Sequence, residues 1–362
     1  MPILGLRYDL RCAPFDATTS ADLMATALEQ CEWADRLGFA AVNLSEHHGS
    51  PDGYLPSPLV FGAAIAARTR NLRIVIAALI APLHDPIRLA EDIAVLDLVS
   101  GGRVVPVVSG GYVESEFRAF GKRLSNRARV MEGIVPWLER AWTGEPFEHN
   151  GATVRVTPRP VQKPRPPIFM GGGSEVAARR AARYADHFIP TLPEFHAIYR
   201  EERVKLGKPD PGPPSRTAGN FLYVAEDPDA AWQRIAPYAM HEMNAYGRWI
   251  AEAGTSGPYR PVDDPDALRA TGQYRIVTPN ELIGIAREMG GLDSILFHPL
   301  MGGMDPELSW ASLRLFEAKV LPVLRAQVAR SSQGREAAAQ RGEAERSVGP
   351  REGGQASEDH QE

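Results

Sequence analysis

The sequence predicts an α/β fold in which eight parallel strands alternate with helices and close into a (β/α)8 barrel. Apolar residues recur in turn with the two-residue period of strands and the 3.6-residue period of helices. The run at residues 72–80, LRIVIAALI, is typical of a strand buried on both faces. With 362 residues, 44% of them hydrophobic, the chain is long enough for one large, well-buried domain.

The first half of the chain gives four strand and helix units. Its strands are predicted at 3–8, 40–44, 72–80 and 103–108. Ser20 is the expected N-cap of the first helix, which Gly38 ends, and a helix of small residues follows at 59–69. Asp85 and Pro86 open the third helix, and a Gly-Gly pair at 101–102 closes it.

The second half repeats this alternation less cleanly. Its strands are predicted at 167–170, 187–190, 221–225 and 294–298, and a helix at 308–324 would close the barrel. The connection between the seventh and eighth strands is too long for a barrel loop, so about 228–278 is expected to form a lid whose tyrosines are Tyr246, Tyr259 and Tyr274. Residues 1–325 would be the catalytic domain, and 326–362, rich in Gln, Glu, Arg, Gly and Ser, a disordered tail.

Charge and cysteine content narrow the class of protein. The formal net charge of -5 gives no reason to expect nucleic acid or a membrane surface as a partner, and favours a small-molecule enzyme. Cys12 and Cys31 are too few for a disulfide framework. The first residues lack a basic segment followed by an apolar run, and no stretch approaches the roughly 18 apolar residues of a membrane helix. We therefore expect a cytoplasmic protein.

In barrel enzymes the chemistry lies after the carboxyl ends of the strands. Glu46, His47 and His48 follow the second strand; adjacent residues of an extended segment point to opposite sides, so a shared metal is disfavoured and no metal site is predicted. On the residues alone, the pair is better explained as structural. His298 follows the eighth strand, and the sequence gives equal weight to two roles for it: contact with the substrate, or a hydrogen-bonded position at the rim of the barrel.

A glycine-rich segment precedes a helix after the fifth strand. Gly172, Gly173 and Ser174 lead directly into Glu175 and Val176. Such a turn lets backbone approach a phosphate at the positive end of the helix, yet a plain serine N-cap explains it equally simply. The GxGxxG fingerprint of dinucleotide-binding folds is absent.

Four segments together resemble the bacterial luciferase-like monooxygenases: AVNLSEHHG, IVIAALIAP, VVSGGYVESEFRAFG and PVQKPRPPIFMGG. The resemblance runs from about residue 3 to about residue 324. It implies a (β/α)8 barrel that binds reduced FMN, or the deazaflavin F420, at its carboxyl-end mouth. It also implies a homodimer, for which the helix at 62–67 could supply an interface or could equally face the sheet.

The resemblance assigns roles to individual residues. His47 would face the flavin and transfer protons, a task suited to an imidazole because it titrates near neutrality. Ala77 and Ala78 would be joined by a cis peptide behind the ring, with Ser109 and Tyr112 beside the cofactor. The phosphate would rest on Gly172, Gly173, Ser174, Glu175 and Val176. Glu116, with Arg118, is interpreted as part of a salt bridge or a helix cap.

One departure leaves the cofactor open between FMN and F420. Many flavin-using members carry an arginine for the phosphate in the loop that contains Gly110, and here that charge is missing. Arg7, Arg179 and Arg180 are candidate substitutes.

Three functions follow from the resemblance. The first is a monooxygenase that uses reduced FMN from a separate flavin reductase, together with oxygen, on a small organic substrate. The second is an F420-dependent hydride transfer without oxygen. The third is a non-catalytic flavin-binding barrel or inactive partner subunit.

Overall fold

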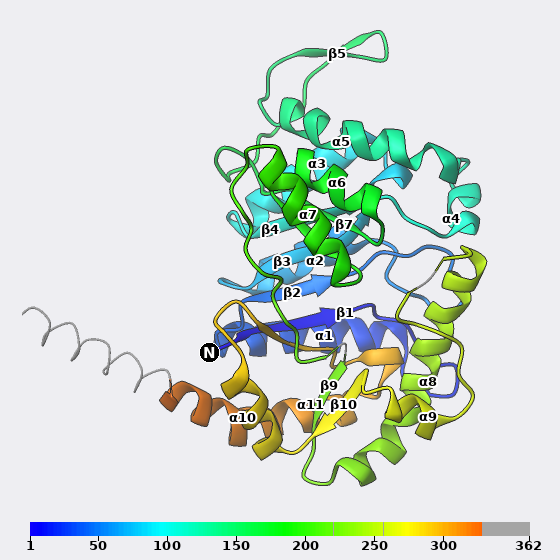
Figure 1. Cartoon of the computed structure of the whole chain (residues 1–362), viewed down its shortest axis with the longest axis vertical. Coiled ribbons are helices and arrows are strands. Elements are labelled where there is room, and N and C mark those ends of the chain that lie inside the picture. The colour runs from blue at the N-terminus through cyan, green and yellow to red at the C-terminus, as the bar shows by residue number, and fades with distance from the viewer. Residues whose placement is uncertain (220, 256, 328–362) are drawn as a thin grey trace, which may run out of the picture.

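The computed structural model describes residues 1–219, 221–255 and 257–327. Its centre is a seven-stranded parallel sheet in the order β11-β1-β2-β3-β4-β7-β8, with helices packed outside it (Figure 1). The strands are β1 (Ile3–Tyr8), β2 (Ala41–Leu44), β3 (Arg73–Ile80), β4 (Val104–Ser109), β7 (Phe169–Gly172), β8 (His187–Pro190) and β11 (Ser294–Phe297), and a separate antiparallel hairpin joins β5 (Phe147–His149) to β6 (Ala152–Val154).

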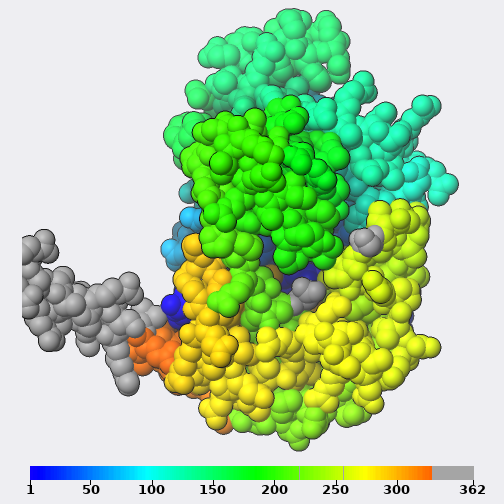
Figure 2. All heavy atoms as spheres, viewed as in Figure 1, coloured from blue at the N-terminus to red at the C-terminus, as the bar shows by residue number. Residues whose placement is uncertain are grey.

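The sheet curls as a half-barrel, so the prediction of eight strands in one closed ladder is wrong in that respect. The predicted seventh strand, β9 (Phe221–Val224), pairs in parallel with β10 (Tyr274–Val277). The segment just before β9 is hydrogen-bonded to the main sheet, because the backbone N–H of Ala218 donates to Ser294 O at 3.1 Å. In the described part of the chain β9 and β8 share no ladder, because β10, taken from the sequence as part of a loop, occupies the hydrogen-bonding edge of β9. Figure 2 shows the molecule hollowed between the green α6–α7 region (175–205) and the yellow insertion.

The helices follow the predicted order. The first is capped by Thr19, one residue before the predicted Ser20, because Thr19 and Asp22 form a reciprocal capping box. The helices are α1 (Ser20–Arg36), α2 (Pro58–Arg68), α3 (Pro86–Ser100), α4 (Glu114–Ala119), α5 (Arg127–Ala141), α6 (Glu175–Tyr184), α7 (Glu194–Lys205), α8 (Pro228–Glu252), α9 (Pro265–Ala270), α10 (Pro279–Glu288) and α11 (Pro306–Leu315), with a π-helical stretch at Phe316–Val320 and short 3-10 turns at Ala81–Leu83, Leu124–Asn126 and Met301–Gly303.

The signals around the third helix are confirmed. The Asp85 carboxylate accepts from the backbone N–H groups of Ile87 at 2.9 Å and Arg88 at 3.2 Å, as an N-cap does. At the other end Gly101 has φ 66°, the left-handed conformation that glycine adopts without steric cost.

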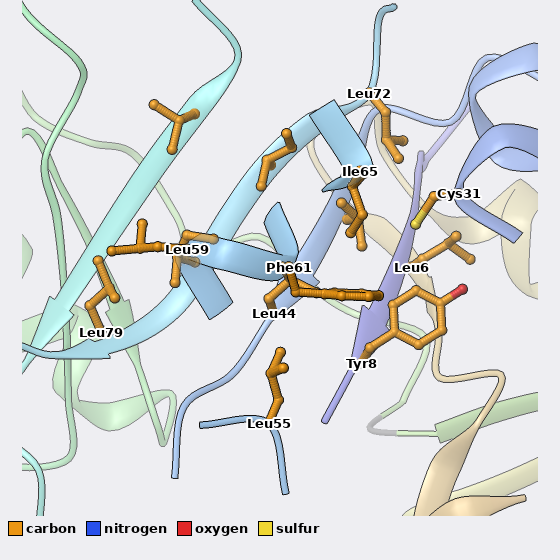
Figure 3. Close-up of a cluster of buried hydrophobic side chains, with 14 of the residues drawn as sticks. Leu6, Tyr8, Cys31, Leu44, Leu55, Leu59, Phe61, Ile65, Leu72 and Leu79 are labelled. Carbon is orange, nitrogen blue, oxygen red and sulfur yellow. The ribbon is translucent and has the colours of Figure 1, made fainter. Parts of the chain in front are cut away.

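The main core lies between the sheet and α1 and α2, as Figure 3 shows. Leu6, Leu44 and Leu79 come from three different strands and are fully buried. Each such side chain stabilises the fold by about 1.5–3 kcal/mol relative to an exposed position. Gly62 faces the sheet, since a Cβ there would lie 3.1 Å from Ile74 Cγ2. This is the second of the two alternatives for residues 62–67.

The insertion at 228–278 is a packed body. Trp232 and Tyr274 are buried in a second apolar cluster with Phe221, and Tyr246 is buried against the barrel. Tyr246 lies on α8 and Tyr274 on β10, so neither belongs to a loop. The prediction of a disordered tail at 326–362 falls, from 328 on, outside the described residues. No helix in the described part of the chain has the length and apolar composition needed to cross a membrane.

Candidate active site

His47 forms a buried pair with Glu116 at the carboxyl end of the sheet. Its Nδ1 lies 2.8 Å from Glu116 Oε1, and the same oxygen accepts from the backbone N–H of His48 at 2.8 Å. An ionised carboxylate only accepts hydrogen bonds, so Nδ1 carries the proton and Nε2 is left free to exchange one. Nε2 faces the hydroxyl of Tyr112 at 3.5 Å. The interpretation of Glu116 as a partner of Arg118 is wrong; Glu116 orients the histidine.

Glu46 anchors the loop that carries His47. Its Oε2 accepts from the backbone N–H of Ile80 at 2.6 Å, and its Oε1 faces Nε2 of both His48 (3.1 Å) and His84 (2.7 Å). Burial alone raises the pKa of Glu46, but these hydrogen bonds from His48 and His84 outweigh it and bring the pKa down to about 2. His47 and His48 thus have different partners, which agrees with a structural role for His48 and gives no support to a shared metal.

Aromatic rings enclose His47. Trp249 of α8 stacks on the imidazole with centroids 4.1 Å apart, and Tyr54 meets it edge-on at 4.9 Å. Tyr112 and Tyr246 lie 5.6 and 6.1 Å away. The insertion therefore covers the histidine, and water has little access to it, since His47 is only 7% exposed.

Small residues meet at the ends of three neighbouring strands. The peptide bond between Ala77 and Ala78 is cis, as predicted, and the register of β3 on β4 shifts there. A Cβ built on Gly171 would make only ordinary contacts, 3.7 Å from Ser109 Cβ and 3.8 Å from Ala78 Cβ. Ala78, Ser109 and Gly171 form a small-residue surface that Val107 borders, since its Cγ1 would lie 3.7 Å from the Cβ built on Gly171.

The start of α6 is the predicted phosphate site, and packing within the protein explains its glycines. Ser174 is the N-cap and accepts from the backbone N–H of Ala177 at 3.2 Å. A Cβ on Gly172 would lie 2.5 Å from Ala177 Cβ, and one on Gly173 would lie 2.3 Å from Thr191 Oγ1. Packing within the protein thus requires both glycines. Exposed Glu175 and Val176 form the first turn, where the helix dipole favours an anion.

The three arginines named as substitutes for the missing phosphate partner lie in ion pairs. Arg7 lies 3.6 Å from Glu242, Arg179 pairs with Glu175 and Glu202, and Arg180 is 3.7 Å from Glu132. A residue that the sequence did not single out is better placed. Arg127, the first residue of α5, has its Cδ 3.5 Å from the Cβ position of Gly110. Its guanidinium donates from one terminal nitrogen to the carbonyl oxygen of Leu124 at 3.3 Å.

A cluster of buried charges lies under the insertion, at the ends of β1 and β11. Arg11 donates to Asp9 and Asp52 at 2.9 Å each, while His298 lies between Asp9 and Glu242. Sequence reasoning identified only His298, at the rim. The other charged residues are spread along the sequence. The two outermost, Asp9 and Glu242, are 233 positions apart, and no local pattern marks any of them.

These features define an α/β protein with a parallel half-barrel sheet, whose candidate functional groups lie at the carboxyl end of that sheet. The chain belongs to the luciferase-like monooxygenase family, whose sequence pattern matches residues 12–277. The resemblance stated from its motifs is thereby confirmed.

Known relatives and solved structures agree with this family. The oxygenase component of the flavin-dependent trigonelline monooxygenase of Acinetobacter baylyi is 25% identical over 85% of this chain and 91% of its own length. The FMNH2-dependent dimethylsulfone monooxygenase of Pseudomonas putida is 25% identical over 62% of this chain and 66% of its own. The crystal structure of monooxygenase RslO1 from Streptomyces bottropensis superposes with a TM-score of 0.71 and 26% identity, over 89% of this chain and 99% of that one. For two further curated relatives the chain matches only about half of their length, 51% and 50%.

Proposed function

We propose that this protein is a monooxygenase that uses reduced FMN and molecular oxygen to oxygenate a small organic substrate. The observation that carries the proposal is the enclosed His47–Glu116 pair beside the small-residue surface at Ala78. Two relatives named above, matched over 91% and 66% of their own lengths, are flavin- or FMNH2-dependent monooxygenases, which supports the same chemistry.

The residues fit the flavin. Glu116 Oε2 is buried and has no protein partner in the described structure, so it is a free acceptor beside the imidazole. The ring would lie on Ala78 and near Ser109 and Tyr112, and the phosphate would approach α6 and Arg127. The residues proposed to hold the cofactor are Ala77, Ala78, Ser109, Tyr112, Gly172, Gly173, Ser174, Glu175 and Val176.

The chain's own residues would then control protons and water. Reduced flavin supplies the electrons for activating oxygen when it is bound. His47 Nε2 would hold or deliver the proton that this chemistry requires, while Glu116 fixes the tautomer of the imidazole. Trp249, Tyr54 and Tyr246 exclude water from the same space, which limits wasteful side reactions. The sequence shows no nicotinamide-binding fingerprint, so a separate reductase would supply the reduced flavin.

Binding measurements with both cofactors test this function. Titration of the purified protein with reduced FMN and reduced F420 under anaerobic conditions, followed by quenching of the protein's tryptophan fluorescence, should show saturable binding of FMN. Admission of oxygen should then trigger FMN reoxidation and conversion of a substrate. Binding of F420 alone, with oxygen-independent hydride transfer, would establish the second function instead. Binding of either cofactor without turnover of any substrate would favour the non-catalytic reading.

We further propose a homodimer formed through α2 and α3. These neighbouring helices expose Val60, Val95, Leu98 and Val99, which are between 44% and 73% accessible. Exposed apolar patches of this kind mark protein interfaces. A second copy of the same face would cover the patch with isologous contacts.

Replacement of Val95 by Glu is expected to convert the dimer into a monomer, because it places a charge in an apolar interface. Light scattering coupled to size exclusion measures the mass, against 39.6 kDa for one chain. Val204→Glu, on exposed α7, is the matched control and should leave the mass of the dimer unchanged. A wild-type protein that elutes as a monomer contradicts the proposal.

A further inference from the structure

A single imidazole joins the insertion to the barrel mouth. His298 follows β11 and is 1% exposed. Its Nε2 lies 3.4 Å from Asp9 Oδ1, just after β1, and its Nδ1 lies 3.3 Å from Glu242 Oε1, on α8. None of these four atoms has a well-formed hydrogen bond within the described structure. The barrel and the insertion thus each present a carboxylate to one side of the same ring.

This arrangement suits a protonated imidazole better than a metal ion. Asp9, Glu242 and His298 are close enough together to suggest a cation site. However, Asp9 Oδ1 lies nearest Nε2 and Glu242 Oε1 lies nearest Nδ1, so each carboxylate faces its own ring nitrogen. Arg7 and Arg11 also stand against Glu242 and Asp9 and would repel a metal ion. An imidazolium carries an N–H on both nitrogens, so a donor group faces each carboxylate, at 3.4 Å for Asp9 and 3.3 Å for Glu242.

Protonation of His298 supplies a third cation to the cluster beside Arg7 and Arg11, while His241 also lies 3.2 Å from Asp52. Three carboxylates, Asp9, Asp52 and Glu242, then face three cations, Arg7, Arg11 and His298. A neutral imidazole has one N–H, so one carboxylate would face a lone pair and the cluster would hold an excess negative charge. The other titratable groups that line the cluster are His241 and Tyr246 of α8, Tyr54 beside Asp52, Tyr259 in the insertion, and Tyr274 of β10, whose hydroxyl donates to Glu242 Oε2 at 2.8 Å.

We infer that protonated His298 is a clasp that docks α8 onto the end of β1, and that the insertion loosens over the mouth when this proton is lost. The same helix carries Tyr246 and Trp249, which cover His47. Release of the clasp therefore uncovers the proposed proton-transfer group. His298 is a positioning residue in this scheme, and the inference does not depend on which cofactor the protein uses.

The direction of the pH dependence follows from the cluster. Burial lowers the pKa of His298, but Asp9 and Glu242 outweigh burial and Arg7, and the net result is a pKa above the ordinary value. A group whose pKa is higher in the folded state contributes stability that is fully present below its unfolded pKa. That contribution is lost as the pH rises through the raised value. Docking of α8 should therefore weaken toward alkaline pH.

Hydrogen exchange of the flavin-free protein tests the clasp without relying on activity. We expect the protection factors of α8 peptides, corrected for intrinsic exchange and compared with α3, to fall by about tenfold or more between pH 6 and pH 9. His298→Gln should show the low protection at both values. His187→Gln, at the amino end of β8 and away from the mouth, should retain the wild-type dependence of α8 protection on pH.

Two further measurements separate the possible causes. An NMR titration of the His298 ring in the wild-type protein should give a pKa above about 6.5, and this measurement remains available if His298→Gln fails to fold. His241→Gln should keep the pH-dependent loss of protection. The clasp is overturned if the wild-type protection of α8 is constant with pH, if His298→Gln keeps the pH dependence, or if the measured pKa is not raised.

Discussion

Replacement of His47 by Asn should lower the rate of substrate oxygenation by about 10²–10⁴-fold, the contribution typical of a positioned acid–base group. Asn fills a similar volume and can still donate a hydrogen bond to Glu116, but it cannot exchange a proton near neutral pH. Reduced FMN should bind with unchanged affinity, because the phosphate and ring contacts proposed here involve other residues. The effect is measured as the rate of FMN reoxidation in a single turnover, with a substrate that the wild-type protein converts.

Two companion variants define what the loss means. Glu116→Gln keeps the shape but replaces a charged hydrogen bond with a neutral one, and the expected loss is on the order of 10–100-fold, equivalent to 1.5–3 kcal/mol. His187→Asn makes the same substitution as His47→Asn, at the amino end of β8 and away from the mouth. It should leave the rate unchanged. Wild-type turnover in His47→Asn would show that this histidine is not the proton-transfer group.

Replacement of Arg11 by Met should lower the free energy of unfolding by about 3–5 kcal/mol, the range for breaking a buried ion pair. Arg11 is fully buried, donates to both Asp9 and Asp52, and lies 4.7 Å over the ring of Tyr246. Removing its guanidinium leaves two buried carboxylates without their main cation. Urea unfolding followed by circular dichroism measures the change.

The double variant Asp9→Asn with Arg11→Met provides the internal test. It should lose less stability than Arg11→Met alone, because it also removes one of the uncompensated charges. The surface pair offers a matched control: Arg68→Met breaks the hydrogen bond to Glu32 (2.6 Å) at a solvent-exposed site and should cost only about 0–1 kcal/mol. Equal losses for Arg11→Met and Arg68→Met would contradict the assignment of Arg11 as the central cation.

Features encoded locally were predictable. The Asp85 cap, the left-handed Gly101 and the alternation of strands with helices each depend on a few consecutive residues, and the structure confirms them. The cis bond between Ala77 and Ala78 and the position of His47 at the mouth came from family resemblance, which reports a tertiary environment already present in relatives. The sequence even named the serine that caps α6.

Features that depend on distant pairing were missed. Glu116 is 69 residues from His47, and the sequence alone favours its neighbour Arg118 as its partner. The four residues of β10 lie in a segment that the sequence predicts as part of a loop. In the structure they pair with β9, and the two strands form a ladder separate from the main sheet. The position of Arg127 beside Gly110 was not predictable, because it depends on how α5 packs in the folded protein.

The sequence by itself thus determined the α/β alternation, the caps of α3 and α6, and the family. Only the tertiary structure decided that the sheet stays a half-barrel, that Glu116 orients His47, and that Asp9, Arg11, Glu242 and His298 meet beneath α8. The physical reason is the range of the forces involved. Backbone hydrogen bonds and apolar periodicity act over a few residues, whereas a buried charge is stable only with a partner that folding brings from another part of the chain.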